Sequence, residues 1–86
     1  MNFEEMKKIT EELESLLREK NKMYGDENVV KMGKGGVLFR IEEKVERLKH
    51  LIKTNQNPEK ETMEDTWKDI ANFGIIGLML ERNKWK

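Results

Sequence analysis

The sequence has no cysteine, a single histidine and no long apolar run among its 86 residues. The absence of cysteine excludes disulfides, thiol catalysis and thiolate metal sites. His50 alone cannot form a histidine-rich zinc site. The longest apolar run, Ile75 to Leu80, is interrupted by Gly77 and is too short to span a bilayer. The first residues, Met1 to Glu5, lack a signal-peptide pattern, so we expect a soluble protein of the cytoplasm.

The chain also lacks an excess of charge of either sign, because its 17 basic and 17 acidic residues cancel. No overall field therefore favours extended nucleic acid or an anionic membrane as a partner. A length of 86 residues allows one domain with a small core. Helical chains of this size often complete their core by self-association, so we expect a homo-oligomer.

The hydrophobic periodicity predicts an all-α fold, a three-helix bundle with a long C-terminal helix that oligomerisation completes. The helices are expected at about residues 3–24, 37–53 and 58–82, and a glycine-rich loop at about 25–36. Asn2 is the expected N-cap of the first helix. Gly74 and Gly77 lie on the apolar side of the third helix, which indicates close contact with another helix of the same or a second subunit.

A stripe of polar residues runs along the third helix, since Glu61, Asp65, Asp69 and Asn72 share one side on a 3.6-residue period. The stripe continues into apolar residues. One interpretation is a solvated acidic face, or carboxylates paired with basic residues of a neighbouring helix. The other is a site for a divalent cation such as Mg²⁺, or for the hydroxyls and amines of a ligand.

Basic residues border the apolar faces of the other two helices. Arg40, Lys44 and Arg47 line one border of the second helix, where they either pair with the third helix and Glu43 or clamp an anion such as phosphate. Lys20 projects into the apolar face of the first helix. It either extends its amine to solvent near the helix end or points inward to meet a phosphate or a carboxylate of the third helix.

Three blocks together resemble a known family. They are residues 20–26 (KNKMYGD), 38–48 (LFRIEEKVERL) and 61–73 (ETMEDTWKDIANF). In this order they are similar to the nucleotide modification associated domain, type 1, of phages and bacteria. That family is in turn distantly similar to the MazG-like all-α nucleoside triphosphate pyrophosphohydrolases.

The resemblance implies a dimeric or tetrameric helical bundle that binds a nucleotide between its helices. The positions that match the family's polar residues are Lys20, Tyr24, Arg40, Lys44, Arg47, Glu61, Asp65, Asp69 and Asn72. Enzymes of the superfamily hold Mg²⁺ with two acidic pairs on separate helices. Here the first pair has no clear counterpart, because Glu43 and Glu46 have the required spacing but lie beside basic residues.

The leading hypothesis is a small oligomeric nucleotide-binding protein of phage type that sequesters a phosphorylated signal nucleotide to counter host defence, in the host cytoplasm. Its expected ligand- or phosphate-binding residues are Lys20, Tyr24, Arg40, Lys44, Arg47 and Asn72. Its expected metal or polar ligand contacts are Glu61, Asp65, Asp69 and Glu43. The alternatives are a Mg²⁺-dependent MazG-like nucleotide pyrophosphohydrolase, whose catalytic residues we do not assign, and a structural helical interaction module.

Overall fold

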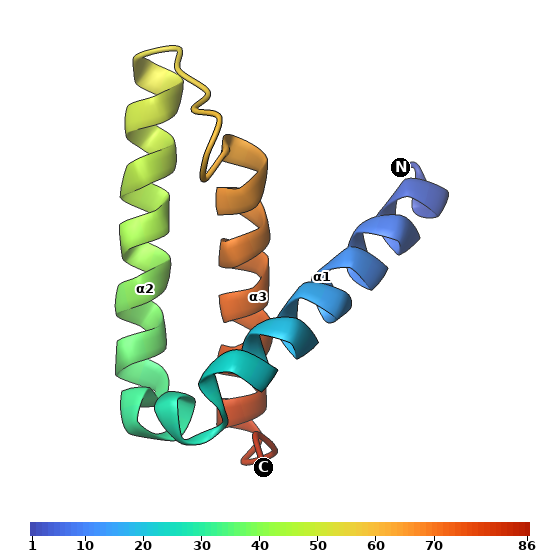
Figure 1. The fold of residues 1–86 in the computed structure, drawn as a ribbon, viewed down its shortest axis with the longest axis vertical. Coiled ribbons are helices and arrows are strands. Elements are labelled where there is room, and N and C mark those ends of the chain that lie inside the picture. The colour runs from blue at the N-terminus through green and yellow to red at the C-terminus, as the bar shows by residue number, and fades with distance from the viewer.

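The computed structural model describes all residues from Met1 to Lys86, and it confirms the predicted all-α fold (Figure 1). Helix α1 spans Phe3–Tyr24, α2 spans Glu27–Lys53 and α3 spans Met63–Glu81. Helices α2 and α3 run side by side in opposite directions, while α1 crosses in front of the lower half of α3 and then projects away from the body (Figure 1). None of the three helices combines the length and apolar character needed to cross a membrane.

The core is small and forms mainly between α2 and α3, which make most of the contacts between helices. Five apolar residues are buried: Leu13 from α1, Val37, Leu48 and Leu51 from α2, and Ile76 from α3. Gly77 of α3 faces Val37, since a Cβ atom built on the glycine would lie 3.8 Å from Val37 Cγ1. Gly77 therefore lies at the contact between α2 and α3, as expected. Gly74, in contrast, has open space around it.

Helix α1 has the predicted bounds because the local signals at both ends are strong. Asn2 caps its first turn, with the side-chain oxygen accepting a hydrogen bond from the backbone N–H of Glu5 at 3.0 Å. Gly25 ends the helix with φ 75°, and its N–H donates to the carbonyl of Asn21 at 2.8 Å.

Helix α2 begins ten residues earlier than predicted, so the expected loop at 25–36 is wrong beyond Asp26. The segment from Glu27 to Met32 is helical and joins the rest of α2 across a kink at Gly33, whose φ is 64° and ψ is −178°. This backbone conformation is nearly exclusive to glycine. Gly33 alone therefore forms one sharp kink, and Val29 and Met32, which precede it, line a cavity.

Helix α3 begins at Met63, five residues later than the predicted start at residue 58. Thr62 and Asp65 form a capping box, in which each side chain accepts a hydrogen bond from the backbone N–H of the other residue. The side chain of Asn57 accepts from the N–H of Met63 at 3.1 Å. Glu61 was predicted to belong to the polar stripe of this helix. That prediction is wrong, because Glu61 precedes the helix and has φ 50°.

Candidate ligand-binding site

A cavity of about 280 Å³ lies between the three helices at the end where α1 turns into α2. Its wall comes from the C-terminal half of α1, the start of α2, the middle of α3 and Trp85 of the C-terminal tail. Five of the ten predicted site residues line it, namely Lys20, Tyr24, Arg40, Asp69 and Asn72. The fold thus brings together residues that lie up to 52 positions apart, counted from Lys20 to Asn72.

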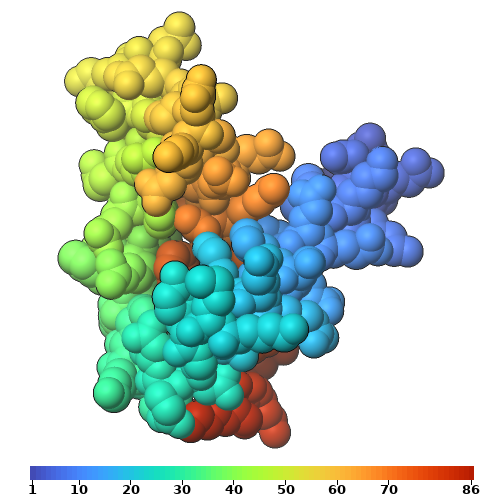
Figure 2. Space-filling model, viewed as in Figure 1, coloured from blue at the N-terminus to red at the C-terminus, as the bar shows by residue number.

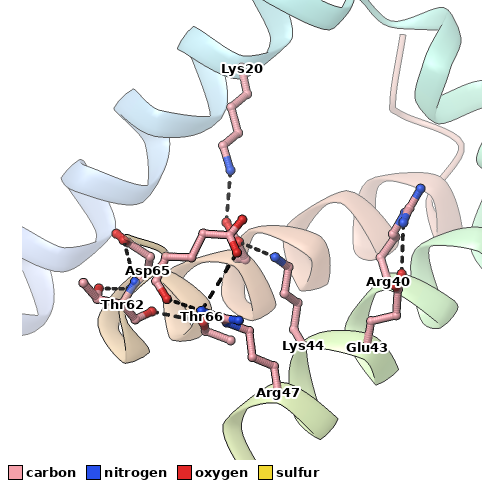
Figure 3. A network of polar contacts seen from close by, with 10 residues as sticks. Lys20, Arg40, Glu43, Lys44, Arg47, Thr62, Asp65 and Thr66 are labelled. Carbon is pink, nitrogen blue, oxygen red and sulfur yellow. Dashed lines mark hydrogen bonds and ion pairs between the residues drawn. The ribbon is translucent and has the colours of Figure 1, made fainter. Parts of the chain in front are cut away.

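Asp69 joins all three helices through one carboxylate. Its Oδ1 lies 3.0 Å from Lys20 Nζ of α1, and its Oδ2 lies 3.1 Å from Lys44 Nζ of α2. Figure 3 shows the two lysines reaching toward α3 from different directions. The Asp69 and Lys44 side chains are 19% and 25% exposed, whereas that of Lys20 is 46% exposed. Lys20 therefore points inward to a carboxylate of the third helix, one of the two alternatives derived from the sequence.

This bridge shifts the titration of the aspartate. Burial raises the pKa of Asp69, but hydrogen bonds from Lys20 and Lys44, together with their positive charges, outweigh that effect and hold the pKa below its ordinary value. The carboxylate is therefore charged throughout the neutral and mildly acidic range. A charged carboxylate held by two lysines is a poor general base.

Asn72 contributes an unsatisfied hydrogen-bond acceptor. The residue is 5% exposed, and its Nδ2 donates to the backbone carbonyl of Leu13 at 3.3 Å. Because only the nitrogen of the amide can donate to a carbonyl, this contact fixes the orientation of the side chain. The Oδ1 atom is then buried with no partner in the protein. A buried polar atom left in this state is destabilising by about 1–3 kcal/mol, and Asn72 lines the cavity.

Aromatic side chains form much of the rest of the wall, from Tyr24, Phe73 and Trp85. Trp85 is held in place because its Nε1 donates to the carbonyl of Asp26 at 3.1 Å. An ion pair between Lys86 and Glu27 fixes the tail beside it. The cavity therefore has apolar, planar walls together with the charged groups of Lys20, Arg40 and Asp69.

The other five predicted residues do not line the cavity; they are Glu43, Lys44, Arg47, Glu61 and Asp65. Arg40, which lines it, pairs through Nη1 with Glu43 Oε1 at 2.9 Å. Arg47 donates from Nη2 to the carbonyl of Glu61 at 2.6 Å and holds the segment before α3 (Figure 3). Asp65 belongs to the capping box. The basic border of α2 is thus ion-paired at Arg40, Lys44 and Arg47.

The acidic residues of the predicted site are engaged with other groups of the chain. No three side chains of histidine, cysteine, aspartate or glutamate lie together. Both oxygens of Asp69 are bound by lysines, and Asp65 caps a helix. The expected Mg²⁺ site and the hydrolase alternative therefore stay predictions.

Several lining residues were not predicted from the sequence, in particular Asn28, Val29 and Met32, which fall in the expected loop. A signal for them was present, because Val29 and Met32 are three residues apart and follow Asp26, a residue type that often precedes helices. Three glycines nearby outweighed that signal. Phe73 and Trp85 are apolar, but no pattern in the sequence places them in one cavity.

Comparisons with protein-family models, with curated proteins and with solved structures find no match to this chain. The resemblance to the nucleotide modification associated domain therefore stays a prediction.

Proposed function

We propose that this protein binds a small phosphorylated ligand of nucleotide type in the cavity between its three helices. The observation that carries the proposal is a cavity with aromatic walls and cationic groups that is also lined by Asn72, a residue whose buried Oδ1 has no partner in the protein. Apolar and aromatic walls with a few fixed polar groups are typical of sites for small molecules. A nucleotide presents the three matching parts: a planar base, hydrogen-bond donors on that base, and a phosphate.

The phosphate is assigned to the side of the cavity that carries Lys20 and Arg40. Both side chains are about half exposed, Lys20 at 46% and Arg40 at 53%, so an incoming anion can reach them. Arginine binds phosphate through two parallel hydrogen bonds, and lysine acts as a point charge. Their carboxylate partners, Asp69 and Glu43, keep both cations oriented before the ligand arrives.

The base is assigned to the aromatic part of the wall. A purine or pyrimidine ring stacks favourably on tyrosine or tryptophan, and Tyr24 and Trp85 both line the cavity. The Asn72 Oδ1 atom accepts a hydrogen bond, so it selects a ligand with an N–H or O–H group at that position. The volume of about 280 Å³ lies near the lower limit for ligand sites, which favours a single nucleotide unit over an oligonucleotide.

We further propose that the ligand is bound without turnover. Asp69, the only carboxylate in the cavity wall, is held between two lysines and cannot readily accept a proton from water. Binding without turnover suits the sequestration of a signal nucleotide. The phage setting and the role against host defence follow from the family resemblance alone.

Tryptophan fluorescence tests the proposal directly, because Trp85 lines the cavity whereas Trp67 does not. In a Trp67→Phe protein, Trp85 is the only tryptophan. We expect nucleotides to change its emission in a saturable way, and the matching unphosphorylated nucleosides to bind more weakly. Lys20→Ala should weaken nucleotide binding about 10- to 100-fold, since hydrogen bonds to charged groups contribute about 1.5–3 kcal/mol.

Arg18→Ala is the matched control for Lys20→Ala. It removes a cation from the same helix, but Arg18 pairs with Glu14 on the surface and does not line the cavity. Its affinity for nucleotide should equal that of the parent protein. Equal losses of nucleotide affinity in both variants would show that overall charge, not the position of Lys20, determines binding. The absence of a saturable fluorescence change with any nucleotide would refute the proposal.

A further inference from the structure

One face of α3 carries an exposed apolar stripe. It consists of Trp67, Ala71, Gly74 and Leu78, at the spacing of four, three and four residues that keeps side chains on one face of a helix. All four are exposed, Trp67 at 57% and Leu78 at 51%. A Cβ atom built on Gly74 would meet nothing within 4 Å. We call these four residues the outward stripe.

The isolated chain exposes more surface than a monomer of its size. Its accessible surface is 6990 Å², whereas folded monomers of 10.3 kDa expose about 5,400 Å². The excess of about 1,600 Å² is about twice the area that each partner buries in a standard protein interface. The radius of gyration, 13.9 Å, likewise exceeds the value of about 12 Å expected for this length.

We propose that a second copy of this chain covers the outward stripe, so that two α3 helices pack antiparallel around a two-fold axis between Ala71 and Gly74. In this register Ala71 lies opposite the partner's Gly74, and Trp67 lies opposite the partner's Leu78. The stripe is therefore complementary to itself, as a two-fold interface requires. Small residues at the centre let the helices approach closely, and the large residues fill the space at both ends.

Charge at the ends of the stripe supports the same orientation. Glu64, in the first turn of α3, lies opposite the partner's Arg82, which follows the last turn. Neither Glu64 nor Arg82 forms an ion pair within the chain, while Glu81 beside them is already paired with Lys34 at 3.2 Å. The antiparallel arrangement forms the Glu64–Arg82 pair twice and sets each helix dipole against its opposite.

The projecting half of α1 also exposes apolar side chains. It extends from the body on the side of α3 that faces away from α2 (Figure 1), and the space-filling view shows it separated from the start of α3 (Figure 2). Phe3, Met6 and Ile9 on this half are 66%, 44% and 43% exposed.

Light scattering coupled to size exclusion tests this interface. The wild-type protein should have the mass of two chains. Gly74→Glu should have the mass of one chain with an unchanged helical circular dichroism spectrum, because Gly74 has open space around it and glutamate favours a helix more than glycine does. Gly35→Glu is the matched control, since Gly35 is also an exposed helical glycine with no atom near its Cβ position. It should remain a dimer.

A charge exchange tests the register. Glu64→Arg and Arg82→Glu should each weaken the dimer, and the double variant should restore it. A monomeric wild-type protein at every concentration tested would overturn the proposal. A Gly74→Glu protein that is still a dimer would overturn this interface. A double variant that dimerises no more tightly than the two single variants would overturn its antiparallel register.

Discussion

Replacing Asp69 with asparagine removes the one charge that links all three helices. Asparagine has nearly the same shape, so the packing around Asp69 remains while both ion pairs, to Lys20 and to Lys44, are lost. The two ammonium groups then lie close to one another without a counter-charge. We expect the variant to fold and to be less stable at neutral pH.

The magnitude follows from the exposure of the two pairs. Surface ion pairs contribute about 0–1 kcal/mol, whereas loss of one partner from a fully buried pair costs about 3–5 kcal/mol. The pair with Lys20, 46% exposed, is near the first case, and the pair with Lys44, 25% exposed, lies between the two. We therefore expect a loss of about 1–3 kcal/mol, which for a domain of this size lowers Tm by about 4–8 °C for each kcal/mol.

The pH dependence gives a sharper test, because it depends on the direction of the Asp69 pKa. The lysines hold this pKa below the value in the unfolded chain, which is about 3.9. The stabilisation is therefore fully present above that unfolded value and is lost as the pH falls through the lower pKa of the folded state. The stability difference between wild type and Asp69→Asn should be constant from pH 7 to about pH 5 and shrink below about pH 4.

Urea unfolding followed by circular dichroism measures this difference at each pH. Glu14→Gln is the control, since Glu14 and Arg18 form an exposed pair on α1 at 2.8 Å, with side chains 67% and 77% exposed. That substitution should change stability by less than about 0.5 kcal/mol. An Asp69→Asn variant as stable as wild type at pH 7, or a difference that does not shrink in acid, would refute the role assigned to this carboxylate.

Two further predictions concern the backbone that shapes the site. Thr62→Ala should lower stability by about 1 kcal/mol, because it removes the capping box with Asp65; a thermal melt equal to wild type would show that the box is not stabilising. Gly33→Ala should cost about 1–3 kcal/mol, because φ at this kink is 64°. Gly35→Ala, at an ordinary helical glycine nearby, should instead raise stability by about 0.5–1 kcal/mol. Equal effects at Gly33 and Gly35 in thermal unfolding would contradict the assigned kink.

The sequence predicted the parts of the fold that local signals control. The cap at Asn2 and the stop at Gly25 define α1, and the apolar period defines the second half of α2. The inward direction of Lys20 was one of two alternatives, since a cation on an apolar face either reaches solvent or finds a buried partner. Only the position of Asp69 in space decides between them.

The two wrong boundaries have physical causes. The glycines predicted a loop at 25–36, but the chain is helical from Glu27 to Met32, and Val29 and Met32 of this segment line the cavity. Gly33 forms the kink between this segment and the rest of α2. The third helix was predicted to begin at residue 58, yet Thr62 and Asp65 form the capping box at its true start. Competing caps a few residues apart cannot be ranked from the sequence alone.

The candidate site was likewise predicted only in part from the sequence. Asp69 and Asn72 share the cavity wall because they are three residues apart on one helix face, which the period predicts. Glu61 was placed on the same stripe, but the chain leaves the helix before it. The missing partner of the Asn72 Oδ1 atom has no signal in the sequence, because it depends on how α1 crosses α3.

A capture-and-release experiment tests the central claim, that the cavity binds a phosphorylated nucleotide and returns it intact. The purified protein is incubated with a nucleotide mixture, with and without Mg²⁺, separated from free ligand and heat-denatured, and the released molecules are identified by mass. The account predicts intact nucleotide from the wild-type protein and a strongly reduced yield from Lys20→Ala. Cleaved products in the unbound fraction, or no retained nucleotide under either condition, would contradict it.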